Sequence, residues 1–229
     1  MRASISQIQA SFRSVANCLR ELELLYDVNE TTVLRLSKNE TRITWSSPNI
    51  RPSLTEFSDS TIGEYLRALK GRHFNFQLTD GALIQFSYDV HRRDHITAGR
   101  AVWFPCPAIF SLDDLEIATI EELVLTTPTE HLACRAPLRI DHAPSLASED
   151  HPVTHMHAGM EDFRLPIQRA LEPSRFLRLI LRTAYPRYWR ARAELITCEN
   201  WGGTDGLTYE DRAVGYLGWN VGVECPAVI

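Results

Sequence analysis

Apolar positions in the first part of the chain follow helical spacing and then the alternation of short strands. Residues 4–26 predict an amphipathic helix, because apolar side chains recur there at steps of three and four and so share one face. These positions are Ile5, Ile8, Phe12, Val15, Leu19 and Leu22. Segments 33–36 and 42–45 flank a polar turn and predict a hairpin. Residues 47–58, with two prolines and several serines, predict a loop.

A second helix is predicted over about 61–70. Thr61 and Glu64 have the spacing of a capping box, in which each side chain accepts a hydrogen bond from the other residue's backbone N–H. Gly71 follows as a C-terminal stop signal, because glycine is the residue most often found just after a helix.

The clearest hairpin follows this helix. Residues 73–78 alternate between polar and apolar side chains, and residues 82–88 form the returning strand. Asp80-Gly81 between them predicts a tight type I′ turn, which requires positive φ at both positions. Alternation weakens in the returning strand, which predicts that both of its faces are partly covered.

The second half predicts more strands, two helices and an irregular end. Ser111 is expected to cap an acidic helix that runs to about residue 125. A helix over about 173–185 begins at Pro173 and ends before Pro186. Its expected apolar face consists of Phe176, Leu177 and Ile180. The expected strands are 99–104, 137–141, 154–157 and a short edge piece at 163–166.

The fold class expected from these elements is α+β, with a single domain over residues 1–194. Its mainly antiparallel sheet is flanked by the N-terminal helix and the helix near 173–185. Residues 195–229 contain six glycines and are expected to form an irregular extension packed on that domain.

Composition narrows the class of protein. The 229 residues are 44% hydrophobic and 23% charged, which is ordinary for a globular domain. No segment reaches the roughly 18–20 apolar residues that a membrane span needs, and no secretory signal core is present. The five cysteines are scattered and include no C-x-x-C pair. We therefore expect a cytoplasmic protein with reduced, buried thiols and no membrane partner.

Basic charge is concentrated in one stretch. Residues 164–192 contain eight arginines and one acid and carry +7, whereas the whole chain carries −5. Arginines interleaved with aromatic rings suit phosphates and single-stranded nucleic acid; a solvated helix face or a docking surface for an acidic protein is the alternative. Together with an arginine of the 137–141 strand, the candidate phosphate-binding residues are Arg139, Arg175, Arg178, Arg182, Tyr185, Arg187 and Trp189.

Three of the eight histidines lie within seven residues, at 151, 155 and 157. In an extended segment, His155 and His157 project from one face of the strand. Arg139 and Asp141 likewise share a face of the preceding strand. A connection of about ten residues allows the two strands to be antiparallel neighbours, which would bring these four side chains together.

Two chemistries fit this cluster. In metal-free phosphodiester cleavage, one histidine takes a proton from the nucleophile and another gives one to the leaving oxygen, while arginine stabilises the phosphoryl charge. The candidate catalytic residues are His151, His155, His157, Asp141 and Arg164.

The second chemistry uses a divalent metal. Two imidazoles and a carboxylate suit Zn²⁺ or Fe²⁺, with His155 and His157 joined by Asp141 or Glu161 as ligands. His155 to Glu161 also matches the His-x-His-x3-Glu part of a cupin motif, without its flanking glycines. The cofactor is therefore none or a divalent metal. Hydrogen-bonded packing histidines are the purely structural alternative.

Several short motifs, in order along the chain, resemble a bacterial domain-of-unknown-function family, number 2290 in its series. The motifs are Asp80-Gly-Ala-Leu-Ile-Gln85, Phe104-Pro-Cys-Pro107, Arg139-Ile-Asp141, His151-Pro-x-x-His155, Arg164-Leu-Pro166 and Pro173-Ser-Arg-Phe176. The likeness covers about residues 5–190 and implies no established activity. The family pattern varies at His157, which argues against a three-ligand metal site.

The Arg-x-Asp strand before a histidine-rich strand is also loosely similar to small toxins of toxin–antitoxin pairs. The first hypothesis is therefore a bacterial nuclease-like toxin or defence effector that acts on RNA or DNA. A non-catalytic antitoxin or adaptor, binding a nucleic acid or a protein encoded nearby, is the rival. A metal-dependent hydrolase or cupin-like protein is the third. The sequence has no phosphate-binding loop of the nucleotide hydrolases and no glycine motif of the dinucleotide-binding enzymes. It also has no nucleophile elbow of the serine hydrolases.

Overall fold

One nine-stranded sheet organises the computed structural model, which describes residues 1–45, 61–133, 135–148, 150–159, 163–195 and 201. The strand order is β1-β4-β5-β6-β7-β8-β9, with β3 also pairing with β5, and β2 with β3. Every pairing between described strands is antiparallel. The strands are β1 (Leu25–Val28), β2 (Thr31–Arg35), β3 (Glu40–Trp45), β4 (Phe76–Leu78), β5 (Leu83–His91), β6 (His95–Phe104), β7 (Leu138–His142), β8 (Thr154–Ala158) and β9 (Leu165–Pro166).

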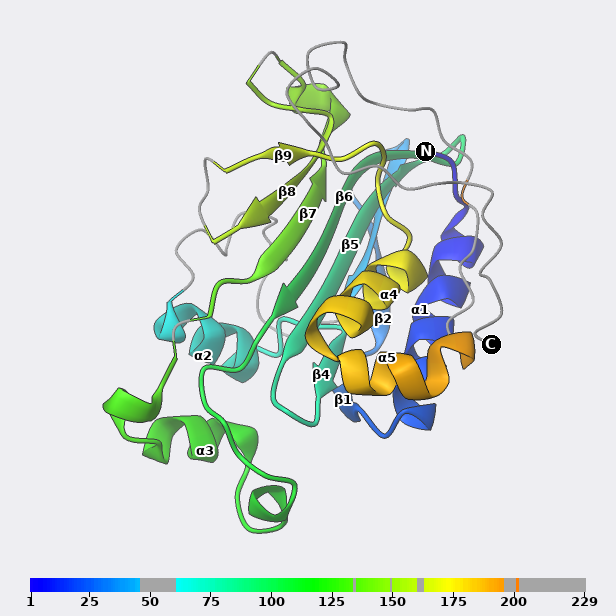
Figure 1. Cartoon of the computed structure of the whole chain (residues 1–229). Helices are drawn as coiled ribbons and strands as arrows, with labels where there is room; N and C mark the ends of the chain where they lie inside the picture. The colour runs from blue at the N-terminus through cyan, green and yellow to red at the C-terminus, as the bar shows by residue number, and fades with distance from the viewer. Residues whose placement is uncertain (46–60, 134, 149, 160–162, 196–200, 202–229) are drawn as a thin grey trace.

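Helices cover both faces of this sheet, which confirms the predicted α+β class (Figure 1). Helices α1 and α4 pack on one face, called here the helix-pair face, and α5 follows α4 there. Helices α2 and α3 pack over part of the opposite face. The α-helices are α1 (Ile5–Glu21), α2 (Ile62–Lys70), α3 (Ile120–Thr126), α4 (Pro173–Ala184) and α5 (Pro186–Arg192), and the 3-10 turns are η1 (Asp113–Glu116), η2 (Thr129–His131), η3 (Pro144–Leu146) and η4 (Ala193–Leu195).

Aromatic rings form the centre of the core on the helix-pair face. Phe86 of β5 lies between Phe12 of α1, with ring centroids 5.5 Å apart, and Phe176 of α4, at 5.6 Å. All three side chains are buried, and buried aromatic pairs contribute beyond their burial of area. The apolar face predicted for the helix near 173–185 is therefore confirmed.

A smaller core lies under α2 on the opposite face. Tyr65 of α2 packs edge-on against Phe104 of β6, with ring centroids 5.6 Å apart. Its hydroxyl donates to the Gly81 carbonyl oxygen at 2.6 Å. The capping box of α2 forms between Thr61 and Glu64 as predicted. Because β5 is covered from both sides, its residues from 83 to 90 are all buried, which explains the weak alternation in its sequence.

The helix predicted over 4–26 is too long. Helix α1 begins after a capping box of Ser4 and Gln7 and ends at Glu21. Glu23 then adopts φ 56°, a left-handed conformation that ends helices. The chain turns into β1, a strand that the helical periodicity concealed.

The predicted type I′ turn at Asp80-Gly81 is also wrong. Only Gly81 has positive φ, at 82°. The Leu78 N–H donates to the Ala82 carbonyl at 2.8 Å, and the Gly81 N–H donates to the Leu78 carbonyl at 2.9 Å. This is the three-residue hairpin loop in which a glycine follows a tight turn.

The acidic helix expected from Ser111 to about 125 is divided. The segment forms the 3-10 turn η1 and then α3, which starts with its own capping box of Thr119 and Glu122. Four large apolar side chains of this excursion between β6 and β7 are exposed: Ile109, Leu112, Ile117 and Leu125.

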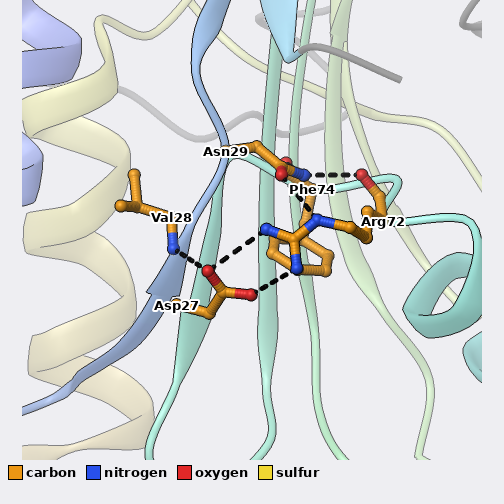
Figure 2. Close-up of polar contacts among 5 residues, drawn as sticks. All are labelled: Asp27, Val28, Asn29, Arg72 and Phe74. Carbon is orange, nitrogen blue, oxygen red and sulfur yellow. Dashed lines mark hydrogen bonds and ion pairs between the residues drawn. The ribbon is translucent and has the colours of Figure 1, made fainter. Parts of the chain in front are cut away.

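A polar cluster ties β1 to the link between α2 and β4 (Figure 2). Arg72, at φ 52°, binds both carboxylate oxygens of Asp27 at 2.6 and 3.2 Å. Asn29 donates to the carbonyl oxygens of Arg72 and Phe74 at 2.7 and 2.8 Å and accepts from the Arg72 Nε at 2.9 Å. These bonds hold the edge strand β1 to the sheet.

Some predictions fall outside the described residues. The loop at 47–58 and almost all of the extension at 195–229 do so, although Trp201 is buried against Tyr88, with ring centroids 5.5 Å apart. Of the cysteines within the described ranges, Cys18 and Cys106 are buried and free, as expected. None of the described helices is long and apolar enough to cross a membrane.

Candidate functional site

The candidate site lies on strands β6, β7 and β8. Asp141 is the register partner of His155, and Arg139 is the partner of His157. Arg100 of β6 is the partner of Asp141 on its other side. Direct partners in an antiparallel sheet project from the same face, so all five side chains share the face opposite the helix-pair face. The predicted pairing of the two strands is confirmed.

Arg164 joins this group from the edge of the sheet. The β8–β9 register pairs His155 with Pro166 and Met156 with Leu165. One further step places Arg164 across from His157, on the same face. The charge of Arg164 acts on the His155 imidazole. Glu161, the alternative metal ligand, lies outside the described residues.

The three imidazole rings contact one another in a row. The ring centroids of His151 and His155 are 4.5 Å apart, and those of His155 and His157 are 4.7 Å apart. Both pairs pack edge to face, at 78° and 70°. The histidine cluster inferred from spacing is therefore a cluster in space.

His155 is held in one tautomer. Its Nδ1 lies 2.8 Å from the carbonyl oxygen of Pro152. A carbonyl can only accept, so Nδ1 carries the proton and the neutral ring has its lone pair on Nε2. Burial lowers the pKa of His155, against the opposing effects of the Pro152 hydrogen bond and the Asp141 charge. The ring is therefore neutral at pH 7.

Asp141 is the anionic centre of the cluster. Arg100 binds it through two nitrogens, Nε to Oδ1 at 2.7 Å and Nη2 to Oδ2 at 2.9 Å. Arg139 Nε lies 3.1 Å from Oδ2, and His157 Nε2 lies 3.6 Å from the same oxygen. Burial opposes ionisation of Asp141, but the charges of Arg100 and Arg139 and the Arg100 hydrogen bond outweigh it and lower its pKa.

Burial divides the cluster into an inner and an outer part. His155 is 1% exposed and His157 is 4% exposed, so these two rings are almost completely shielded from water. His151 and Arg164 are half-buried. They are the members that solvent and a ligand meet first.

The cluster contains ligand types that suit a divalent metal, but the positive charges of neighbouring arginines oppose metal binding. Ligand atoms of Asp141, His155 and His157 all lie within 4.8 Å of one another. However, Arg100 and Arg139 already bind the carboxylate. A divalent cation beside two guanidinium groups would meet strong repulsion in a poorly solvated site.

Two arginines of the basic stretch contact other residues of the fold. Arg175 Nε lies 2.6 Å from an Oε2 carboxylate oxygen of Glu172. Arg178 packs over the Trp189 ring, with its guanidinium carbon 5.1 Å from the centroid. Arginine stacked on an indole gains a cation–π contact, so this pair has a structural role.

Tyr185 is buried, and its hydroxyl donates to Asp80 Oδ2 at 2.8 Å. Its ring therefore offers no open face for a base. Arg182 and Arg187 are exposed. Because α4 and α5 lie on the helix-pair face, the arginines of these two helices and the histidines are on opposite faces of the sheet, whereas Arg164 lies on the histidine side. The basic surface of α4 and α5 therefore does not adjoin the histidine cluster.

Arg100 is the site residue that the sequence analysis missed. It lies 41 residues before its partner Asp141, so local spacing does not connect them. The available signal was its position, since a charged residue inside the otherwise apolar strand 99–104 is costly unless it has a buried partner.

Comparison with models of known protein families gives a match. The model of a family described as "Uncharacterized conserved protein (DUF2290)" matches residues 24–217. This confirms the resemblance inferred from the motifs, although the match starts after α1 and extends into the glycine-rich end. Neither the curated proteins nor the solved structures include a match to this chain.

Proposed function

The chain belongs to the DUF2290 family of uncharacterised conserved proteins, and from its histidine cluster we propose a nuclease-like effector that cleaves phosphodiesters without a metal ion. The observation that carries this proposal is the contact between half-buried His151 and buried His155, whose Nδ1 is fixed by Pro152. A neutral imidazole with a defined acceptor nitrogen beside a second imidazole is the pair that acid–base cleavage needs.

Each group then has a role. His155 Nε2 takes the proton from the attacking hydroxyl, which is a ribose 2′-hydroxyl in RNA or water in either nucleic acid. His151 gives a proton to the oxygen that leaves phosphorus. Arg164 binds the non-bridging phosphoryl oxygens, because a guanidinium matches their geometry and charge. Asp141 and Arg139 position His157 and the neighbouring backbone rather than contact the substrate.

The test is cleavage by purified protein of end-labelled single-stranded RNA and DNA in the presence of EDTA. Removing a general base typically costs about 10²–10⁴-fold in rate, so His155→Ala should lose at least about a hundredfold. His142→Asn is the matched control, because His142 is also a buried histidine but projects from the opposite face. Circular dichroism checks that each variant is folded. Full activity in His155→Ala, or no cleavage of either substrate by the wild type, would refute the proposal.

A metal-dependent hydrolase is the second candidate, supported by the proximity of Asp141, His155 and His157. In that case cleavage would stop in EDTA and return with Zn²⁺, Mn²⁺ or Fe²⁺, and elemental analysis would find metal bound in stoichiometric amounts. Metal-free activity in EDTA separates the two candidates.

A non-catalytic antitoxin or adaptor is the third candidate. Its support is the set of exposed arginines on α4 and α5, namely Arg182, Arg187, Arg190 and Arg192, which suits an acidic protein or a nucleic acid in the cytoplasm. Expression alone distinguishes them. An effector should slow growth of the host cell in a His155-dependent way, whereas an adaptor expressed without its partner should not.

A further inference from the structure

Two polar residues beside the histidine cluster lie opposite each other on adjacent strands. Ser87 of β5 and Arg100 of β6 are direct register partners. Their side chains therefore project from the same face, with Cβ atoms about 5 Å apart. Ser87 is 1% exposed, and the Arg100 side chain is 13% exposed.

Both residues have a polar atom without a hydrogen-bond partner. Within the described ranges, Ser87 Oγ and Arg100 Nη1 are buried and neither has one. Arg100 uses its Nε and Nη2 edge for Asp141. Nη1 lies on the other edge of the planar guanidinium, directed away from that carboxylate. Buried groups of this kind are normally satisfied, so an unsatisfied cationic donor and an unsatisfied hydroxyl on neighbouring strands point to a missing acceptor.

We propose that Ser87 and Arg100 form a binding site for an oxyanion of the phosphate class. The fixed fork of a guanidinium and a hydroxyl donor suit a tetrahedral anion with several acceptor oxygens. Charge decides between an anion and a neutral ligand. The two guanidinium groups of Arg100 and Arg139 share one carboxylate, that of Asp141. A bound anion would therefore balance the remaining positive charge.

The position of this site defines a substrate class, and this step rests on the proposed nuclease function. Only β7 separates Arg100 from His155. Strands in a sheet are about 4.8 Å apart, so the backbone of His155 is about 10 Å from that of Arg100 and about 14 Å from that of Ser87. One phosphate therefore does not contact both Ser87 and His155. The anion at Ser87 is a different phosphate from the one that is cleaved, and the substrate is an oligonucleotide rather than a phosphomonoester.

Binding of inorganic phosphate tests the site without requiring catalysis. We expect phosphate to raise the melting temperature of the full-length protein above that in chloride at matched ionic strength, and titration calorimetry to give a saturable isotherm. In Ser87→Ala the dissociation constant should rise about tenfold, as for loss of one hydrogen bond to a charged group. Ser11→Ala is the matched control, because Ser11 Oγ is also buried without a partner but belongs to α1 on the helix-pair face.

The outcomes separate this inference from the proposed function. Equal phosphate affinity in the wild type and Ser87→Ala, or no binding by the wild type, overturns the anion site even if the protein cleaves RNA. Phosphate binding that depends on Ser87 but persists in His155→Ala supports the site even if no nuclease activity is found. Arg100→Lys is the second variant, since it keeps the charge but removes Nη1, and it should weaken phosphate binding as Ser87→Ala does.

Discussion

His142 should make the protein sensitive to mild acid. Its side chain lies on the helix-pair face, is 9% exposed and shares a 2.8 Å hydrogen bond between Nδ1 and Thr154 Oγ1. Burial, the positive N-terminus and His155 lower the pKa of His142 from 6.5 to about 4. In the unfolded chain the imidazole takes up a proton near pH 6.5, whereas the folded protein resists protonation until about pH 4.

This difference sets both the sign and the size of the effect. Between these two pKa values the unfolded state binds more protons, so the free energy of unfolding falls as the pH falls. A difference of about 2.5 pKa units corresponds to about 3.4 kcal/mol below pH 4, and integration gives about 2 kcal/mol at pH 5. Above pH 6.5 the contribution of His142 is fully present.

The assay is urea unfolding followed by circular dichroism at pH 7, 6 and 5. His142→Asn is the informative variant, because an amide keeps a polar contact with Thr154 but does not titrate in this range. Between pH 7 and pH 5 the wild type should lose about 2 kcal/mol more stability than His142→Asn. His155 is present in both proteins, so its own titration cancels in the comparison. Parallel stability curves over this range would refute the reasoning.

Three further substitutions test the packing by thermal or urea unfolding. Asn29→Ala should cost about 1–3 kcal/mol, because two backbone carbonyls and the Arg72 guanidinium lose their partner; an unchanged midpoint would contradict this. Gly81→Ala should cost at least about 1 kcal/mol, since φ is 82° and the new Cβ would lie 2.8 Å from Cys106 Sγ; unaltered stability would be inconsistent with that turn. Trp201→Ala should cost about 3–5 kcal/mol, because the indole is 2% exposed in the main core; a loss below about 1 kcal/mol would show that this residue is not integrated.

The parts of the fold that sequence predicts best are those specified by neighbouring residues. The capping box of Thr61 and Glu64 and the apolar face of α4 depend on spacings of three and four, and both are confirmed. Strand β1 was missed because four residues carry little pattern of their own. Its stability comes from β4 and from Arg72, 45 residues away.

In the candidate site, too, contacts between neighbouring segments are predictable from sequence and long-range contacts are not. His155 and Asp141 were brought together correctly, because a strand pair joined by a short connection has few possible registers. Arg100 and Ser87 belong to earlier strands and reach the site only through the order of the sheet. The arginines near Tyr185 in the sequence predict a role in nucleic-acid binding, whereas its hydrogen-bond partner Asp80 lies 105 residues away. The catalytic roles themselves remain predictions.

The shortness of β9 bears on how a ligand reaches His155. On the outer side of β8, Leu165 and Pro166 are the described residues that form β9, and proline has no amide hydrogen to donate. The next amide, Ile167, donates to the Thr154 carbonyl at 2.8 Å. A two-residue edge strand opens locally at lower free energy than the central strands of the sheet, so the amides of this margin should exchange with deuterium early. The inner imidazoles can then be uncovered transiently by fraying of one margin, while the hydrophobic core stays intact.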